Sequence, residues 1–190
     1  MGTLMAFEHV SVDGFFAGPH GEIDWFKSIG KDAEYERYTH SAAKGGSGLV
    51  LGRTTYELLK KCWPTPAAQK DDPAMARVVD ESPKLVFSKK LKTPKDEPNW
   101  KNVTVVDEID ASDVAKRKEE AGRGLTILGS GSVVQQLAKL GLIDEYQFVV
   151  VPVVLGEGKR LFEGVAETDL KLYETKAFPN GVLVTKYRPA

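Results

Sequence analysis

The sequence lacks most features that mark secreted, membrane and metal-binding proteins. Cys62 is the single cysteine in 190 residues, which excludes an internal disulfide and a zinc site built from thiolates. No apolar run approaches the roughly 20 residues that a membrane-spanning helix needs. Basic residues number 26 and acidic residues 27, a net charge of −1, so no excess of charge attracts nucleic acid or a membrane surface. We therefore expect no nucleic-acid or membrane partner.

Two catalytic patterns are also missing. The three histidines, His9, His20 and His40, do not have the His-Glu-x-x-His spacing of a zinc protease. No Gly-x-Ser-x-Gly segment occurs, which disfavours a serine hydrolase of the α/β-hydrolase type. We therefore expect no metal site and no hydrolase of either class.

The length and composition are those of one globular domain. Of the 190 residues, 42% are hydrophobic and 28% charged, as in ordinary folded domains with a sizeable core. We expect a single domain over residues 1–190. The lone cysteine and the absence of a leader-like N-terminal segment predict a cytoplasmic protein.

Strand-like apolar segments alternate with helix-like segments, which predicts an α/β architecture. The predicted strands are 4–12, 47–51, 84–88, 103–106, 125–128 and 145–154. The predicted helices are 32–43, one that begins at Thr54 or Thr55, 111–122, and one that ends near Gly141. Residues 170–178 and 181–187 form a predicted hairpin because Asn180-Gly181 is a strong turn signal. The proline-rich stretch 63–72 is interpreted as a surface excursion.

A glycine-rich junction is the first candidate site. Four small residues join the strand 125–128 to the next helix: Gly129, Ser130, Gly131 and Ser132. Backbone N–H groups and the helix dipole at such a junction favour a phosphate, which glycine allows to approach closely. The segment is not the full G-x-G-x-x-G fingerprint, because Val134 replaces the third glycine. A plain strand-to-helix turn capped by Ser130 or Ser132 is the alternative.

Two other strand ends carry residues that suit a phosphate. The strand 47–51 leads through Gly52 to Arg53 and Thr54, and a cation at a helix N-terminus is unfavourable unless an anion joins it. Ser88 ends the strand 84–88, and Lys89 follows it. A solvated arginine beside a Thr54 cap and an ordinary run of surface charge are the alternatives. Because ligands of open α/β sheets bind at the carboxyl ends of strands, the three strand ends together predict a nucleotide cofactor.

Five short stretches, followed by Leu161-Phe162, occur in an order that spans nearly the whole chain: Ser11–Ala17, Leu51–Glu57, Val86–Lys89, Gly129–Ser132 and Pro152–Gly158. In this order they resemble the C-terminal reductase domain of bifunctional riboflavin-biosynthesis proteins, and more broadly the dihydrofolate reductase-like family. The zinc deaminase signature of the bifunctional proteins, His-x-Glu with Pro-Cys-x-x-Cys, is absent. The chain is therefore identified as a stand-alone member, equivalent at most to the reductase half.

The resemblance implies a dihydrofolate reductase-like fold, a three-layer sandwich with a mainly parallel central sheet and an antiparallel C-terminal edge. It implies NADPH as the hydride donor and a small heterocyclic or carbonyl substrate, as for 5-amino-6-(5-phosphoribosylamino)uracil reductase. By position, the segment Gly52–Thr54 would meet the cofactor's phosphates, and Ser88 and Lys89 its 2′-phosphate and adenosine ribose. The loop Gly129–Ser132 would lie against the pyrophosphate. The resemblance also implies a homodimer.

Reduction of a C=N or C=O bond needs a proton as well as a hydride. Asp13 is one candidate donor, because it lies at a strand end beside a glycine loop. Asp24 adjoins Trp25, and an aromatic neighbour can raise the pKa of a partly buried carboxyl. Glu157 lies between two glycines in the loop predicted to border the substrate. Each of the three also fits a plain role in a turn or loop, and water could supply the proton instead.

Two other functions fit the same residues. A non-catalytic NADP-binding module or sensor of this fold would bind the cofactor without oxidising it. A structural homodimer with an empty phosphate-like pocket would bind no cofactor. Cofactor binding separates the last interpretation from the other two, and oxidation of NADPH separates a reductase from a sensor.

Overall fold

One eight-stranded sheet organises the fold, with strand order β5-β4-β3-β6-β1-β7-β10-β9. The computed structural model describes residues 2–43, 48–91 and 100–190. Parallel pairing joins β1 (Leu4–Ser11), β3 (Gly48–Gly52), β4 (Lys84–Phe87), β5 (Val103–Val106), β6 (Leu125–Leu128) and β7 (Glu145–Val151). β10 (Leu183–Pro189) pairs antiparallel with β7 and with β9 (Leu170–Ala177). The predicted α/β class, with a mainly parallel sheet and an antiparallel C-terminal edge, is confirmed.

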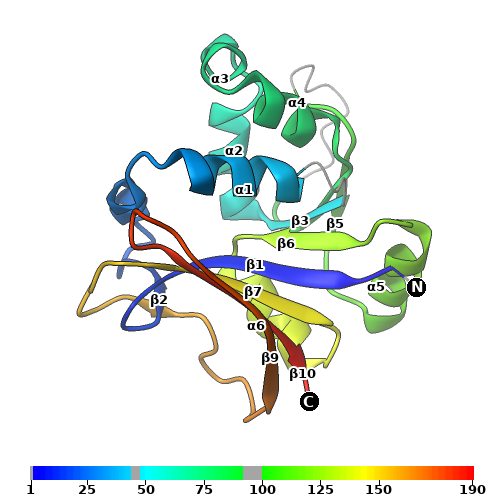
Figure 1. Ribbon diagram of the computed structural model, residues 1–190. Helices are drawn as coiled ribbons and strands as arrows, with labels where there is room; N and C mark the ends of the chain where they lie inside the picture. Colours follow the sequence, from blue (N-terminus) through cyan, green and yellow to red (C-terminus); the bar gives the residue numbers. More distant parts are fainter. Residues whose placement is uncertain (1, 44–47, 92–99) are drawn as a thin grey trace.

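Helices cover both faces of the sheet and complete the three layers (Figure 1). One face, the upper one in Figure 1, carries α1 (Ala33–Ala43), α2 (Arg53–Cys62), α3 (Pro66–Asp71) and α4 (Pro73–Glu81). The other face carries α5 (Ala111–Glu120) and α6 (Gly131–Lys139). No helix in the described ranges combines the length and the apolar character needed to cross a membrane.

The alternating side chains of β1 show why this strand is buried on both faces. Leu4 and Ala6 pack into the cluster that contains Leu137 of α6, while Phe7 packs with Trp25 and Tyr35 on the α1 face. Successive residues of a strand point to opposite faces. β1 is therefore a central strand on which helices of both layers pack, and any polar side chain on it is drawn into the core.

The sequence-based prediction missed the short elements. α3 and α4 lie in and after the stretch 63–72, which we interpreted as a surface excursion. Thr65 accepts a hydrogen bond from the amide of Ala68, and Asp72 from that of Met75. A proline follows each of these two caps, and a capping residue before proline is a regular helix start. The two prolines were therefore start signals, and the interpretation as a plain excursion was wrong.

Two further small elements lie beside the carboxyl ends of the central strands. β2 (Phe15–Ala17) pairs with β8 (Lys159–Arg160) within the loops that follow β1 and β7. The 3₁₀ helix η1 (Asp24–Ile29) leads towards α1. Ser47, the first residue of the strand predicted over 47–51, lies outside the described residues. The predicted strand 145–154 ends as a strand at Val151.

Lys84 joins α4 to the sheet through a buried ammonium group. The residue is 1% exposed, and its Nζ donates to the carbonyl oxygens of Asp80, Ser82 and Lys101 at 2.9, 2.8 and 3.1 Å. The same ammonium lies 4.8 Å from the ring centroid of Trp100. A cation near the end of a helix also interacts favourably with the helix dipole.

Lys84→Met should lower the free energy of unfolding by about 1–3 kcal/mol, because it leaves buried carbonyl groups without their donor. Urea denaturation measures the change. Lys101→Met is the matched control, since the Lys101 side chain is 71% exposed and ion-paired at 3.5 Å with Asp80. The control should change stability by no more than about 0.5 kcal/mol. Equal effects of the two substitutions would contradict a structural role of the buried ammonium.

Candidate functional site

The carboxyl edge of the sheet is stepped. β3, β4 and β5 end level with one another, because Gly52 pairs with Phe87 and Phe87 with Val106. The last residue of β6, Leu128, pairs with Phe7 of β1. β1 continues beside β7 as far as Ser11, so its residues 8–11 project beyond the end of β6. We call this region the step. It lies just beyond the carboxyl ends of β3 and β6 and beside the projecting part of β1.

The helices α2 and α6 both begin at the step, one on each face of the sheet. Their N-caps, Gly52 and Ser130, make no side-chain capping hydrogen bond within the described residues. α3, α4 and α5 are capped by Thr65, Asp72 and Asp110, and Asp32 accepts from the first-turn amides of α1. The uncapped amides of α2 and α6 can therefore accept an anion. The predicted alternatives, a cap from Ser130 or Ser132 at α6 and a cap from Thr54 at α2, are not observed among the described residues.

Glycine allows the two helix starts to touch. A Cβ atom on Gly52 would collide with Ser130, and one on Gly129 would lie 3.1 Å from Cγ2 of Thr55. Gly129 also has a φ of 71°, in the left-handed region that glycine adopts without strain. The absence of side chains at Gly52 and Gly129 thus brings the N-termini of α2 and α6 together across the step. At this contact the backbone of Gly52 faces the side chain of Ser130, and the backbone of Gly129 faces the side chain of Thr55.

The ring of Phe16 covers the first residue of α6. A Cβ atom on Gly131 would collide with this ring, and Phe16 packs partly buried against the core on the α6 face. Packing against Phe16 is therefore enough to explain why residue 131 is glycine. A phosphate that reaches the backbone of Gly131 needs the Phe16 ring to move.

The basic residues follow the same edge in strand order. Arg53 and Thr54 are exposed in the first turn of α2, and Nη1 of Arg53 lies 3.0 Å from Oε1 of Glu57. Lys89 is exposed just beyond β4. Ser88 is buried, and its hydroxyl oxygen accepts from the amides of Lys90 and Leu91 at 3.2 and 2.9 Å. The side chain of Ser88 thus shapes the turn that presents Lys89.

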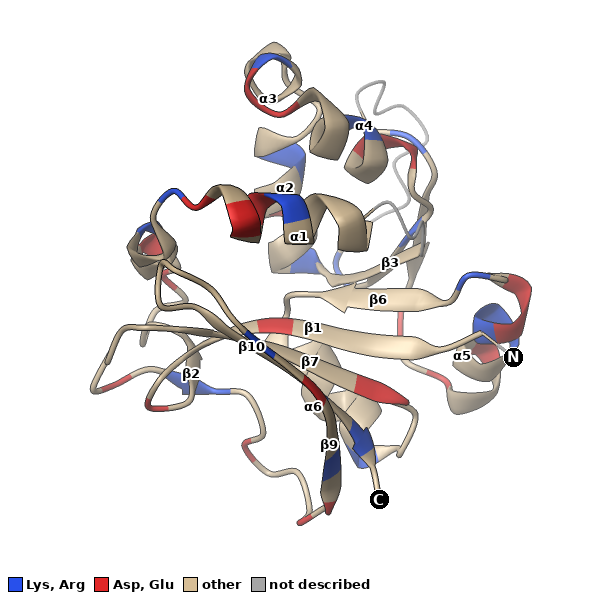
Figure 2. Ribbon diagram, viewed as in Figure 1, with Lys and Arg blue, Asp and Glu red and all other residues tan. Residues whose placement is uncertain are grey.

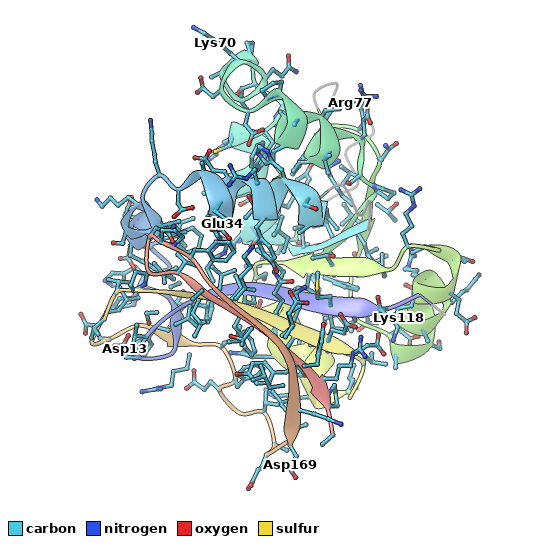
Figure 3. All side chains as sticks on the ribbon, viewed as in Figure 1. Asp13, Glu34, Lys70, Arg77, Lys118 and Asp169 are labelled. Carbon is cyan, nitrogen blue, oxygen red and sulfur yellow. The ribbon has the colours of Figure 1, made fainter. Side chains whose placement is uncertain are left out.

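Asp13 anchors the loop that follows β7. Its Oδ1 accepts from the amide of Leu155 at 3.1 Å and its Oδ2 from the amide of Gly156 at 2.7 Å. The Ser11 hydroxyl and these two amides lower the pKa of Asp13 to about 2, so the group is a carboxylate at neutral pH. This geometry disfavours Asp13 as a proton donor. The Asp13 carboxylate holds the loop after β1 against the loop that carries Glu157. Figure 3 labels Asp13 at this edge.

The other two predicted carboxyls are on the surface. Asp24 is exposed in the first turn of η1, although its neighbour Trp25 is buried. Glu157 is exposed in the loop after β7. Neither forms an ion pair or a side-chain hydrogen bond within the described residues. Their role in proton transfer stays a prediction.

Sequence reasoning gave no role to two ionisable residues of β1, the buried Glu8 and the half-buried His9. Glu8 is 3% exposed and its Oε1 has no hydrogen-bond partner among the described residues. Burial raises the pKa of Glu8 to about 8. On the opposite face, Nε2 of His9 lies 3.2 Å from the hydroxyl of Tyr35, and burial lowers the pKa of His9 to about 4. A charged residue within a strand predicted to be apolar was the signal that could have identified Glu8.

A hollow of the described surface lies at the other edge of the sheet. It has a volume of about 340 Å³ and is lined by residues that include Thr3, Lys118, Asp144 and Arg188. Lys118 pairs with Asp144 at 2.5 Å and Arg188 with Glu145 at 2.7 Å. Figure 3 labels Lys118 at this edge and Asp13 at the opposite one. Because its charges are already paired, this hollow is a poorer anion site than the step. No group of metal-ligating side chains gathers within the described ranges.

The comparisons with known sequences agree with this geometry. A family model, that of the RibD C-terminal domain, matches residues 3–184. The uncharacterized protein YyaP of Bacillus subtilis is 27% identical over 179 residues, covering 94% of this chain and 90% of YyaP. The uncharacterized protein YwjB of the same organism is 32% identical over 174 residues, covering 91% of this chain and 90% of YwjB.

Solved structures share the fold over the whole chain. A putative riboflavin biosynthesis protein from Shewanella sp. PV-4 has a TM-score of 0.75 and 23% identity, covering 100% of this chain and 99% of that one. A Thermotoga maritima deaminase/5-amino-6-(5-phosphoribosylamino)uracil reductase has a TM-score of 0.66 and 15% identity, covering 100% and 57%. Dihydrofolate reductase from Enterococcus faecalis, complexed with NADP(H), has a TM-score of 0.60 and 15% identity, covering 98% and 96%. These likenesses confirm the predicted dihydrofolate reductase-like fold.

Asp13→Ala should release the loop after β7, because the amides of Leu155 and Gly156 lose their shared acceptor. Native-state hydrogen exchange should then be faster at these two amides than in the unaltered protein. Asp24→Ala removes an exposed carboxyl at the same edge and serves as the control, with no change expected at Leu155 or Gly156. Unchanged protection of both amides in Asp13→Ala would remove Asp13 from its anchoring role.

Proposed function

The chain belongs to the RibD C-terminal domain family, and from that premise we propose that it is a reductase that uses NADPH to reduce a small heterocyclic or carbonyl compound. One observation carries the proposal. The only two α-helices without a side-chain cap in the described ranges, α2 and α6, start together at the glycine-lined step. Two uncapped helix N-termini that converge at glycine positions suit a dinucleotide's phosphates better than they suit a plain turn.

The residues present fit NADPH in an extended pose along the edge. The pyrophosphate would lie on the loop Gly129–Ser132 and on the α2 start at Gly52, Arg53 and Thr54. Lys89, with Ser88 shaping its turn, would meet the 2′-phosphate. The strand order β4-β3-β6-β1 supports this arrangement, in which the nicotinamide end would lie towards β1. The cofactor would supply the hydride.

The protein's own groups would orient the ligands and control access. Phe16 would leave Gly131 as the cofactor enters, and its ring would then border the bound dinucleotide. Asp13 would hold the loops after β1 and β7 in contact, which positions both around the substrate. Asp24 and Glu157 remain proposed sources of the proton, together with water. The substrate would resemble that named for the Thermotoga maritima relative, a heterocycle with a reducible bond.

A non-catalytic NADP-binding module or sensor is the second candidate function. The observation that favours it is the state of the predicted proton donors, because Asp13 is an anchored carboxylate while Asp24 and Glu157 are exposed. Both functions require cofactor binding. Loss of NADPH absorbance with a panel of heterocyclic and carbonyl compounds would distinguish a reductase from a sensor.

We also propose that residues 1–190 act as one domain in a cytoplasmic homodimer. β9 is the edge strand of the sheet, and its Leu172 and Tyr173 are 49% and 40% exposed. Apolar side chains on an unpaired edge favour association with a second copy. Cys62 is a free and exposed thiol, which suits a reducing compartment. Analytical ultracentrifugation would test the dimer.

NADPH should raise the melting temperature of the protein much more than NADH does. At about 100 times the dissociation constant, a ligand adds roughly 2.7 kcal/mol to stability, or roughly 5–10 °C for a domain of this size. Differential scanning fluorimetry measures the shift. A shift with NADPH and little with NADH supports a 2′-phosphate site. No shift with either cofactor would contradict the proposed function.

Lys89→Ala should weaken the binding of NADPH by roughly tenfold and leave the affinity for NADH nearly unchanged. The reason is that one charge-assisted contact to the 2′-phosphate contributes about 1–2 kcal/mol. Isothermal titration measures both affinities. Lys90→Ala, which removes the neighbouring exposed lysine, is the matched control. An equal loss in the two variants would indicate general attraction by positive charge rather than a site at Lys89.

A further inference from the structure

Glu8 lies beside the step, on the face of the sheet where α6 begins. β1 pairs with β6 up to Phe7 and Leu128, so Glu8 is the first residue of β1 beyond that ladder, one register position past the end of β6. Alternation along the strand puts Glu8 on the same face as Leu4 and Ala6, which pack with α6. Glu8 is the acidic residue of β1 and is the red band on that strand in Figure 2.

The carboxyl group of Glu8 has no partner that explains its burial. It is 3% exposed, and Oε1 accepts and donates no hydrogen bond within the described residues. Buried polar atoms in proteins are nearly always hydrogen-bonded, so an orphaned one calls for an explanation such as a missing ligand. Phe148 of β7 is its neighbour in the ladder, and Val10 and Phe16 belong to the same core cluster.

The charge state of Glu8 follows from this apolar setting. Burial is the cause that raises its pKa to about 8, so the group is a neutral carboxylic acid at pH 7. Tyr146 of β7 and Tyr187 of β10 lie on the same face of the sheet as Glu8, and Lys139 of α6 and Lys159 and Arg160 of β8 are charged residues of elements on this side. Lys139, Lys159 and Arg160 are exposed, Arg160 lies over the ring of Phe15 at 4.7 Å, and Glu145 is paired with Arg188. None of them forms an ion pair with Glu8 within the described residues.

We propose that Glu8 faces the nicotinamide end of the bound cofactor and supplies the proton that accompanies hydride transfer. This inference rests on the proposed function. It assigns the acid role to a residue that borders the step, is kept protonated by its surroundings and has an unsatisfied oxygen. A general acid works best when its pKa is near the working pH.

The electron and proton balance of the step is simple. The carbon of the substrate's C=N or C=O bond receives a hydride, and the dihydronicotinamide that gives it is oxidised to a nicotinamide cation. The π electron pair moves to the nitrogen or oxygen, which forms a bond to the Glu8 proton as the O–H bond of Glu8 breaks. Glu8 becomes a carboxylate beside the cationic ring, and water reprotonates it after the products leave.

Other ionisable groups near the step are weaker donors. Asp13 is a carboxylate held by two amides. His9, on the α1 face, is a neutral imidazole bonded to the Tyr35 hydroxyl, and burial raises the pKa of Tyr35 to about 12. A neutral imidazole and a phenol of high pKa release a proton less readily than a carboxylic acid does.

The test compares proton release on binding of the oxidised and the reduced cofactor. The ring of NADP⁺ is cationic and that of NADPH is neutral, so only NADP⁺ should lower the pKa of a facing carboxyl. Isothermal titration at pH 7 in two buffers of different ionisation enthalpy should show close to one more proton released per chain with NADP⁺ than with NADPH. The 2′-phosphate occurs in both cofactors, so its own titration cancels in the difference.

Glu8→Gln should abolish this difference while both cofactors still bind, because glutamine is an isostere that cannot ionise. Glu119→Gln, an exposed carboxyl of α5 far from the step, should retain it. Binding of both cofactors with equal proton release in the unaltered protein would overturn the role of Glu8 and leave the proposed function intact, even if Glu8→Gln failed to fold. A difference that persists in Glu8→Gln would also overturn it. No binding heat with either cofactor would overturn the proposed function and this inference together.

Discussion

The contact between Gly52 and the Ser130 loop is the constraint on which the site depends. Any side chain at Gly52 would collide with the side chain of Ser130, so the two helix starts can meet only because Gly52 presents bare backbone to Ser130. The contact fixes where α2 and α6 begin on opposite faces of the sheet. It also places their uncapped amides at the step, where the shorter strands end and β1 continues. The location of the proposed anion site is thus set by strand length and glycine placement rather than by a charged side chain.

Burial of ionisable groups in β1 is the second physical feature of the site. Because the strand is covered on both faces, Glu8 and His9 are each driven towards their neutral form, one on either side. The folded-state pKa of Glu8 lies above its unfolded value, so the protein loses stability as the pH rises from about 4.5 towards about 8. At pH 7 the cost is about 3 kcal/mol. His9 has the opposite pH dependence, because its folded-state pKa lies below its unfolded value. The protein therefore loses stability at this residue as the pH falls from about 6.5 towards about 4. A core position that costs this much stability is where a functional residue is expected.

The parts of the fold with strong local signals could be predicted from the sequence. The parallel strands, α1, α2, α5, α6 and the Asn180-Gly181 hairpin followed from apolar runs, glycine breaks and turn chemistry. η1, β2, β8, α3 and α4 did not, because they are short and depend on tertiary contacts or on caps such as Thr65 and Asp72. The three strand ends that carry the predicted cofactor residues do meet along one edge of the sheet. Two contacts of the site could not be predicted from the sequence, because each joins segments that are separate in the chain. The anchoring of Leu155 and Gly156 by Asp13 joins residues 142 and 143 positions apart, and the cover of Gly131 by Phe16 joins two separate loops.

A backbone-amide NMR titration with NADPH tests the central claim, that a dinucleotide binds along the step, most directly. The account predicts that the amide signals of Thr54, Lys89 and the loop Gly129–Ser132 shift together on titration. Signals from Thr3 and Asp144, at the opposite edge of the sheet, should stay in place. Shifts that gather instead around Lys118 and Asp144, or no shift at the step at saturating cofactor, would contradict the account.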